Sequence, residues 1–139
     1  MPSSEPLSPP PAAYLDTSAL VKLVLPEAET AALRDELTRW ERHVSSALAR
    51  TELVRACQPA GTAARRLAER VVAELDLLMI DEAILDAAGR LKPLTLRTLD
   101  AIHVASAQAL GPALGVLLAY DQRLLAGAKA ARLPVIVPR

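Results

Sequence analysis

Two aspartates in this sequence each follow a short apolar segment, a position where carboxylates often bind ligands. Asp16 comes directly after residues 12–15, and Asp121 comes directly after residues 116–120. Both segments have the length and continuous apolar character of buried strands. In a parallel sheet the carboxyl ends of the strands meet at one edge, and ligands bind in the crevice beyond it. The spacing therefore predicts that Asp16 and Asp121 lie at one ligand-binding edge.

Two further acids stand within segments predicted to be helices. Asp100 lies in the first turn of residues 99–110, and Glu52 lies among largely apolar neighbours in residues 48–57. Four carboxylates in one pocket would repel one another unless a divalent cation neutralised them. Oxygen ligands with few nitrogen or thiolate partners suit Mg²⁺ or Mn²⁺. Such an ion suits phosphoryl chemistry, because it orients a phosphate, generates hydroxide and stabilises the leaving oxygen.

Each of these acids also has a structural interpretation. Asp16, Asp100 and Asp121 could be N-caps of the helices that begin near them. Glu52 could form an ion pair with Arg55 on its own helix, an exposed interaction of small energetic value. The residues alone leave both interpretations open, but the matching positions of the acids favour one shared site.

The strands and helices that would position these acids alternate along the chain. Apolar runs ended by Gly, Pro, Asp and Ser mark their boundaries. Short apolar strands alternating with helices predict an α/β fold, with a short central parallel sheet covered by helices on both faces. The expected strands are residues 12–15, 43–46, 75–80, 116–120 and 135–137, and the expected helices are residues 19–25, 26–40, 48–57, 62–74, 81–91, 99–110 and 123–131.

The length of the chain limits it to one globular domain. At 139 residues it is too short for two independent cores. Residues 1–11 are rich in proline and serine, so they are expected to form a disordered tail before a domain at residues 12–139. A hydrophobic fraction of 52% without any phenylalanine predicts a core of Leu, Val, Ile and Ala.

Charge and composition exclude several kinds of partner. Sixteen cationic and sixteen anionic side chains give a formal net charge of zero, which argues against a basic coat for nucleic acid or membranes. An aromatic fraction of 2% argues against stacking platforms for bases. The one cysteine, Cys57, excludes an internal disulfide and fits a reducing cytoplasm.

Residues 101–120 contain no Asp, Glu, Lys or Arg, but Gly111 and Pro112 predict a helix, a turn and a strand there rather than a membrane span.

Four motifs in order resemble one known family. The sequence is similar to PIN domains, in the short single-domain form of VapC-type toxins of bacterial toxin–antitoxin pairs. The likeness covers residues 12–139 and implies a three-layer α/β/α sandwich with the PIN-like arrangement. The motifs that carry it are residues 14–20 (YLDTSAL), 51–53 (TEL), 99–105 (LDAIHVA) and 119–124 (AYDQRL).

The resemblance implies a cytoplasmic endoribonuclease that depends on Mg²⁺ or Mn²⁺. It further implies RNA as substrate, a homodimer, and a cognate antitoxin whose C-terminal segment occupies the active-site groove and silences it. Asp16 and Asp100 would be direct metal ligands, and Glu52 and Asp121 would hold metal-bound waters or a second ion. The full set implied is catalytic Asp16, Glu52, Asp100 and Asp121, metal-binding Asp16, Asp100 and Asp121, and substrate-binding or site-supporting Ser18, Arg97 and Arg123.

Several residues beside the acids have more than one interpretation. Arg97 and Arg123 flank the two late acids and could hold phosphate charge with a bidentate fork or form surface ion pairs. His103 lies three residues after Asp100, which permits a metal-binding or general-base role as well as a structural one. Ala119 departs from relatives that carry Thr or Ser there, so a polar contact beside the fourth acid is expected to be missing.

Two other functions compete with the nuclease. A catalytically inactive PIN-like module that binds RNA or protein would keep the fold and lose the reaction. An aspartyl-phosphate phosphatase would need a second Asp at the position of Ser18, and that residue is absent. No P-loop or Gly-x-Ser-x-Gly motif is present either.

Overall fold

The computed structural model describes residues 9–139. Most of the predicted tail at residues 1–11 lies outside this range. Residues 9–11, its described end, are exposed and belong to no helix or strand.

In the described part of the chain, five parallel strands form one sheet in the order β3-β2-β1-β4-β5. The sequence order reverses between the central strands β1 and β4, which is where ligands bind in open α/β sheets. The predicted parallel sheet is therefore confirmed. The strands are β1 (Ala12–Leu15), β2 (Arg42–Ser46), β3 (Asp76–Leu78), β4 (Leu114–Leu118) and β5 (Val135–Ile136).

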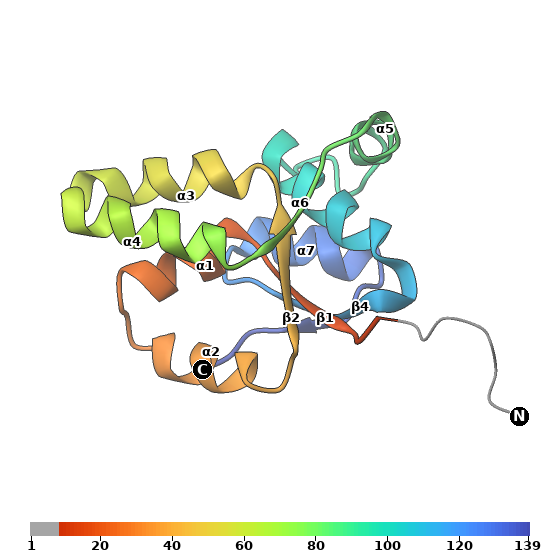
Figure 1. The fold of residues 1–139 in the computed structure, drawn as a ribbon. Helices are drawn as coiled ribbons and strands as arrows, with labels where there is room; N and C mark the ends of the chain where they lie inside the picture. The colour runs from red at the N-terminus through yellow and green to blue at the C-terminus, as the bar shows by residue number, and fades with distance from the viewer. Residues whose placement is uncertain (1–8) are drawn as a thin grey trace, which may run out of the picture.

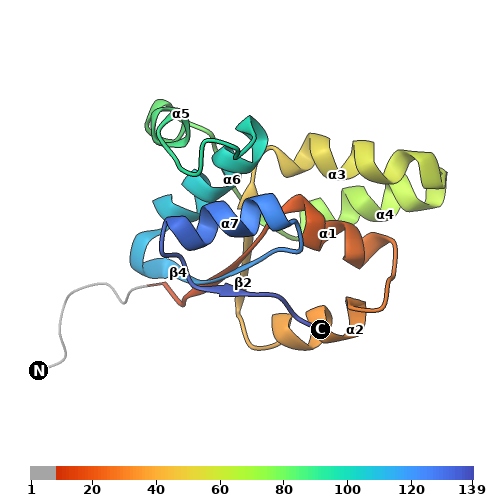
Figure 2. The same ribbon diagram turned by 180° about the vertical axis from the view of Figure 1, so that it is seen from behind.

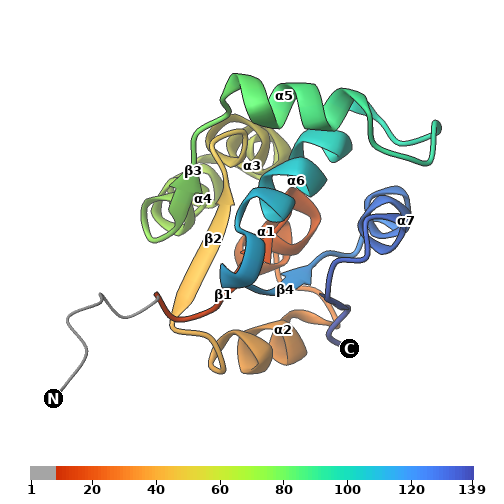
Figure 3. The same ribbon diagram turned by 90° about the vertical axis from the view of Figure 1, so that its right-hand side faces the viewer.

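Within residues 9–139, seven α-helices cover the two faces of this sheet and complete the three layers (Figures 1 and 2). Side chains alternate along β1, so Ala13 and Leu15 pack against α1 to α4, whereas Ala12 and Tyr14 pack against α6 and α7. Helix α5 packs on α6 (Figure 3). The helices are α1 (Thr17–Val24), α2 (Thr30–Leu37), α3 (Ala49–Cys57), α4 (Thr62–Ala73), α5 (Glu82–Gly89), α6 (Thr98–Ala109) and α7 (Gln122–Ala130).

The predicted helix at residues 26–40 is too long at both ends. Residues 26–29 form a turn instead of a first helical turn, because side chains hold the chain there. The Thr30 hydroxyl donates to the Lys22 carbonyl oxygen at 2.8 Å and accepts from the Glu27 backbone N–H at 2.9 Å. The Lys22 ammonium also donates to the Glu27 carboxylate at 2.9 Å. This local network of a buried threonine and lysine outweighs the helix-initiating preference of Pro26.

The uncharged segment 101–120 forms α6, a 3₁₀ turn at Gly111–Ala113 and then β4, as predicted. Among the described residues, no helix has both the length and the apolar character needed to span a bilayer. Strand β4 ends at Leu118, earlier than predicted, because Leu118 pairs with Leu15 at the last position of β1. Asp121 therefore follows a short turn rather than the strand itself.

Candidate active site

Asp16 is a buried carboxylate at the end of β1. It is the N-cap of α1, and its Oδ1 accepts the Ala19 backbone N–H at 3.0 Å. Only 3% of the residue is exposed. Burial raises the pKa of Asp16 to about 6, although hydrogen bonds from the Ser18 hydroxyl and the Ala19 backbone N–H oppose the rise. The structural N-cap interpretation is thus correct for Asp16, but its burial leaves the negative charge poorly solvated.

The Ser18 hydroxyl connects the ends of the two central strands. It donates to the Asp16 carboxylate, with Oδ1 at 2.7 Å and Oδ2 at 2.8 Å. The same oxygen accepts the backbone N–H groups of Tyr120, at 2.8 Å, and Asp121, at 3.2 Å. Ser18 therefore orients Asp16 and joins it to the turn that carries Asp121, at the point where the strand order reverses.

One hollow of about 290 Å³ brings together five of the seven predicted site residues. Its lining includes the carboxylates of Glu52, Asp100 and Asp121, which come from α3, α6 and the turn after β4. Arg97 and Arg123, both exposed, stand beside these acids. The remaining two predicted residues, Asp16 and Ser18, do not line the hollow and reach it only through the Asp121 turn.

Asp100 and Asp121 differ in how they are held. Asp121 is the N-cap of α7, and its Oδ1 accepts the backbone N–H groups of Arg123 at 2.9 Å and Leu124 at 3.2 Å. Asp100 lies in the first turn of α6 but is not its N-cap, so the N-cap interpretation is wrong for this residue. Burial and then the charge of Asp121 raise the pKa of Asp100, because a second negative charge nearby disfavours ionisation.

Glu52 is held by two donors on the same oxygen. Its Oε1 accepts the Thr17 hydroxyl at 2.8 Å and the His103 Nε2–H at 2.6 Å. Burial raises the pKa of Glu52, but the hydrogen bonds from His103 and Thr17 oppose this effect, and the pKa is lowered. Within residues 9–139 the alternative ion pair with Arg55 does not form.

The partners of Glu52 were only partly foreseen from the sequence. His103 is 2% exposed and faces Glu52 and the Tyr14 hydroxyl, so its structural interpretation fits the observed contacts. Thr17 and Tyr14 were missed as polar partners. The available signal was the polar side chain of His103 on the face of α6 that packs against the sheet. Ala119 is completely buried in the core beneath α6 and α7, and it does not line the hollow.

Comparison with known proteins identifies the family of this chain. A model of the PIN domain family matches residues 13–130. The chain belongs to the PIN-domain family. It is 51% identical over 127 residues to Ribonuclease VapC46 of Mycobacterium tuberculosis (strain ATCC 25618 / H37Rv), covering 91% of this chain and 98% of that protein.

Two further relatives of this PIN domain come from the same species. Ribonuclease VapC35 of strain ATCC 25618 / H37Rv is 43% identical over 129 residues, covering 90% of this chain and 96% of the relative. Ribonuclease VapC47 of strain CDC 1551 / Oshkosh is 39% identical over 121 residues, covering 84% of this chain and 89% of the relative. The resemblance drawn from the four sequence motifs is confirmed.

The hollow that Glu52, Asp100 and Asp121 line in this PIN domain fits a hard divalent cation. Carboxylate oxygens are the ligands that Mg²⁺ and Mn²⁺ prefer. Burial and then the charge of Asp121 raise the pKa of Asp100, and a bound cation would stabilise its ionised form. The cap of Asp121 uses only Oδ1, which leaves Oδ2 available. Within residues 9–139 no three acidic, histidine or cysteine side chains converge closely enough to hold a metal alone. Water and phosphate would complete the coordination, as is usual for Mg²⁺.

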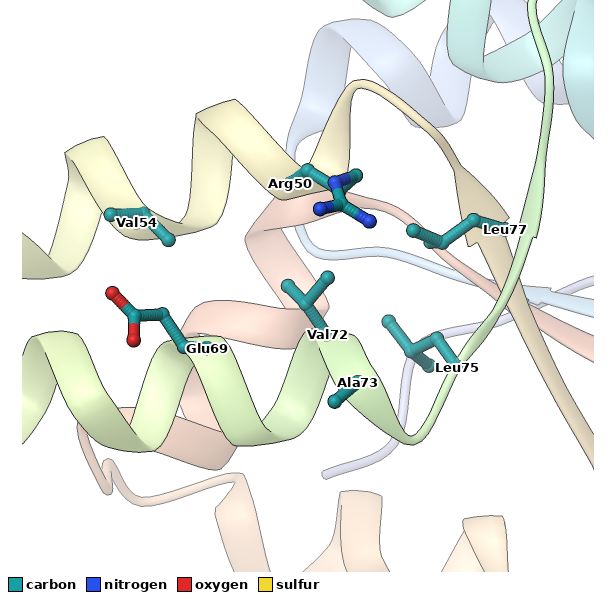
Figure 4. Close-up of a pocket in the computed structure, with 7 residues that line it drawn as sticks. All are labelled: Arg50, Val54, Glu69, Val72, Ala73, Leu75 and Leu77. Atoms are coloured by element: carbon teal, nitrogen blue, oxygen red, sulfur yellow. The ribbon is translucent and has the colours of Figure 1, made fainter.

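The PIN domain has another hollow, of about 320 Å³, on a different part of the molecule. It lies between α3 and α4, which run side by side, and Figure 4 shows Val54 of α3 opposite Glu69 of α4. Val72, Leu75 and Leu77 make most of its surface apolar. Its one carboxylate is that of Glu69, which already pairs with Arg65 at 3.1 Å. This hollow therefore lacks the group of carboxylates found in the hollow with Glu52, Asp100 and Asp121.

Proposed function

We propose that this PIN domain is a metal-dependent endoribonuclease, and that it acts in the cytoplasm as the toxin of a toxin–antitoxin pair. The reaction would hydrolyse RNA phosphodiester bonds with Mg²⁺ or Mn²⁺ held by carboxylates. The hollow that three acids and two arginines line together carries the proposal. The similarity to three ribonucleases of the VapC type supports the choice of RNA as substrate.

The side chains around the hollow divide into three roles. Asp16, Asp100 and Asp121 would hold the metal ion. When bound, such an ion activates water as a nucleophile and neutralises charge on the phosphate. The guanidinium groups of Arg97 and Arg123 would bind the non-bridging phosphate oxygens, for which their planar fork is suited.

Glu52 and Ser18 would position the reacting groups. Glu52 has both intramolecular donors on Oε1, so Oε2 is available to orient the attacking water. Ser18 donates to the Asp16 carboxylate and would fix the orientation in which Asp16 binds the ion. Water would attack phosphorus and the bond to the leaving ribose oxygen would break, which leaves one phosphate end and one hydroxyl end.

Purified protein should cleave RNA only when a divalent cation is present. We expect discrete fragments of total RNA with Mg²⁺ or Mn²⁺ and intact RNA with EDTA. Because the ion binds the folded state only, the melting temperature should also rise in millimolar Mn²⁺. Asp100→Asn should remove cleavage and reduce the metal-dependent rise in melting temperature.

The same measurements distinguish the alternative of an inactive binding module. Such a module would bind RNA or a protein without cutting RNA, and Asp100→Asn would leave its binding and melting temperature unchanged. Intact RNA in Mg²⁺ and in Mn²⁺, together with an unshifted melting temperature, would contradict the nuclease proposal.

The proposal includes two protein partners, a cognate antitoxin and a second copy of this chain. The antitoxin would occupy the groove over the acids, as the resemblance to VapC-type toxins implies. An exposed apolar surface supports the homodimer: Leu94 is 93% exposed and Leu85 is 49% exposed, and both border a hollow of about 260 Å³ between α5 and α6. Contiguous apolar surface of this kind commonly marks a protein interface.

Leu94→Asp should convert the homodimer into a monomer. The new charge would be buried without a partner in the contact between copies, which disfavours association strongly. Sedimentation velocity measures the change. Met79→Asp is the matched control, because Met79 is 77% exposed but does not border this hollow. A wild-type monomer, or equal loss of the dimer in both variants, would contradict the assignment of this surface.

A further inference from the structure

A buried chain of hydrogen bonds runs from the core of the sheet to Glu52. The Tyr14 hydroxyl lies 2.8 Å from His103 Nδ1, and His103 Nε2 lies 2.6 Å from Glu52 Oε1. The Thr17 hydroxyl donates to the same Oε1 at 2.8 Å. The four residues come from β1, α6, α3 and α1, so the chain connects four elements of the fold.

The contacts define where the protons lie. An ionised carboxylate can only accept hydrogen bonds, so the nitrogen that faces Glu52, Nε2, must carry a hydrogen. A phenol hydroxyl is a hydrogen-bond donor, so the Tyr14 hydroxyl can donate to Nδ1. A neutral imidazole with its single hydrogen on Nε2 satisfies both contacts. Tyr14 and Glu52 therefore favour the same tautomer of His103, in which Nε2–H donates to Glu52 and Nδ1 accepts from Tyr14.

We propose that Tyr14 and His103 are positioning residues that fix Glu52 for RNA cleavage, an inference that rests on the proposed nuclease function. With Oε1 held by His103 and Thr17, only Oε2 is left for a ligand in the hollow. A free glutamate side chain would have to be ordered in every catalytic cycle, at a cost in conformational entropy. Holding it in advance removes that cost at the reacting centre.

Tyr14→Phe tests this inference with the smallest possible change. The ring remains in the core, but His103 Nδ1 loses its donor, so the tautomer with hydrogen on Nε2 is less strongly favoured. We expect kcat for RNA cleavage to fall about 10- to 100-fold with little change in KM, as is typical when the partner of a functional side chain is removed. Thr38→Val is the control for loss of a hydroxyl, because the Thr38 hydroxyl donates to the Asp35 carbonyl oxygen and lies outside the hollow. It should stay within about twofold of wild type.

A double-mutant cycle separates positioning from a structural role. If Tyr14 acts through Glu52, then Tyr14→Phe should lower kcat by less than about twofold once Glu52→Gln is present. An equal loss in both backgrounds would overturn the inference, and so would full activity of Tyr14→Phe. A wild-type protein that leaves RNA intact would instead refute the proposed function, so the two failures are distinguishable.

Nitrogen NMR of the histidine rings tests the hydrogen bonds of His103 without measuring RNA cleavage. The chain has two histidines, His43 and His103, so His43→Gln assigns the spectrum. At pH 7.5 we expect His103 to show hydrogen on Nε2 alone, and Tyr14→Phe to shift it towards a mixture of tautomers. Hydrogen on Nδ1 in the wild type, or a spectrum unaltered in Tyr14→Phe, would overturn the inference.

Discussion

Asp16→Asn should abolish RNA cleavage while leaving the metal-free protein folded and more stable than wild type at neutral pH. We expect the cleavage rate to fall by at least about 10³-fold, the scale on which removal of one preorganised electrostatic group slows an enzyme. The amide oxygen can still accept the Ala19 backbone N–H and the Ser18 hydroxyl, so the cap of α1 survives. What the variant loses is the negative charge that would hold the cation.

The gain in stability follows from the burial of Asp16. Burial raises the pKa of Asp16 to about 6 from 3.8, so the folded state binds the proton more tightly than the unfolded state. Its contribution to stability is therefore fully present below pH 3.8 and is lost as the pH rises through 6. The loss amounts to roughly 3 kcal/mol at pH 8. Asparagine does not titrate, so the variant avoids this loss.

Urea unfolding in EDTA between pH 4 and pH 8 measures the difference. The free energy of unfolding of Asp16→Asn relative to wild type should increase across this range. Asp35→Asn is the matched control, because Asp35 is exposed on α2 and outside the hollow, and it should change neither cleavage nor stability. A variant that still cuts RNA at the wild-type rate would remove Asp16 from the metal site.

Much of the fold could be predicted because local signals agree with the global arrangement. The apolar runs of β1 and β4 identify the buried central strands, and the Gly111 and Pro112 pair separates α6 from β4. The length of the second helix could not be predicted, because its start depends on the contact of Thr30 with the Lys22 carbonyl oxygen. That contact joins residues eight positions apart through a turn that no periodicity reveals.

The candidate site divides in the same way. Asp16 and Asp121 both lie beyond the ends of neighbouring parallel strands, as their spacing predicts, but Asp121 follows Ala119 and Tyr120 rather than β4 itself. The partner of Glu52 was not predictable from spacing, because His103 lies 51 residues away and meets it only after α3 and α6 have packed. Helical periodicity gives the face on which His103 lies, but not which residue on another element stands opposite.

The contact between Gly115 and Trp40 predicts a substitution that lowers stability at a place far from the acids. A Cβ added at Gly115 would overlap three carbon atoms of the Trp40 ring. Gly115 lies at a bulge of β4, between Leu114 and Val116, which pair with Ala12 and Ala13 of β1 and limit how far the backbone can shift. The ring would have to move, although its Nε1–H donates to Glu36 Oε2 at 2.9 Å and it packs on the core.

Gly115→Ala should therefore lower the free energy of unfolding by about 2–3 kcal/mol, the usual cost of overpacking a core. Trp40 is the one tryptophan, so a red shift of its emission in the folded state would report displacement of the ring directly.

Gly89→Ala is the matched control: no atom lies within 4 Å of its added Cβ, at the end of α5. That change should be neutral or stabilise by up to about 1 kcal/mol. Equal stability of Gly115→Ala and wild type, with unchanged emission, would contradict the prediction and mean that the β4 backbone shifts away from the Trp40 ring. Because the hollow with the acids lies at the other end of β4, beyond Leu118, Gly115→Ala should still cleave RNA at temperatures where it remains folded.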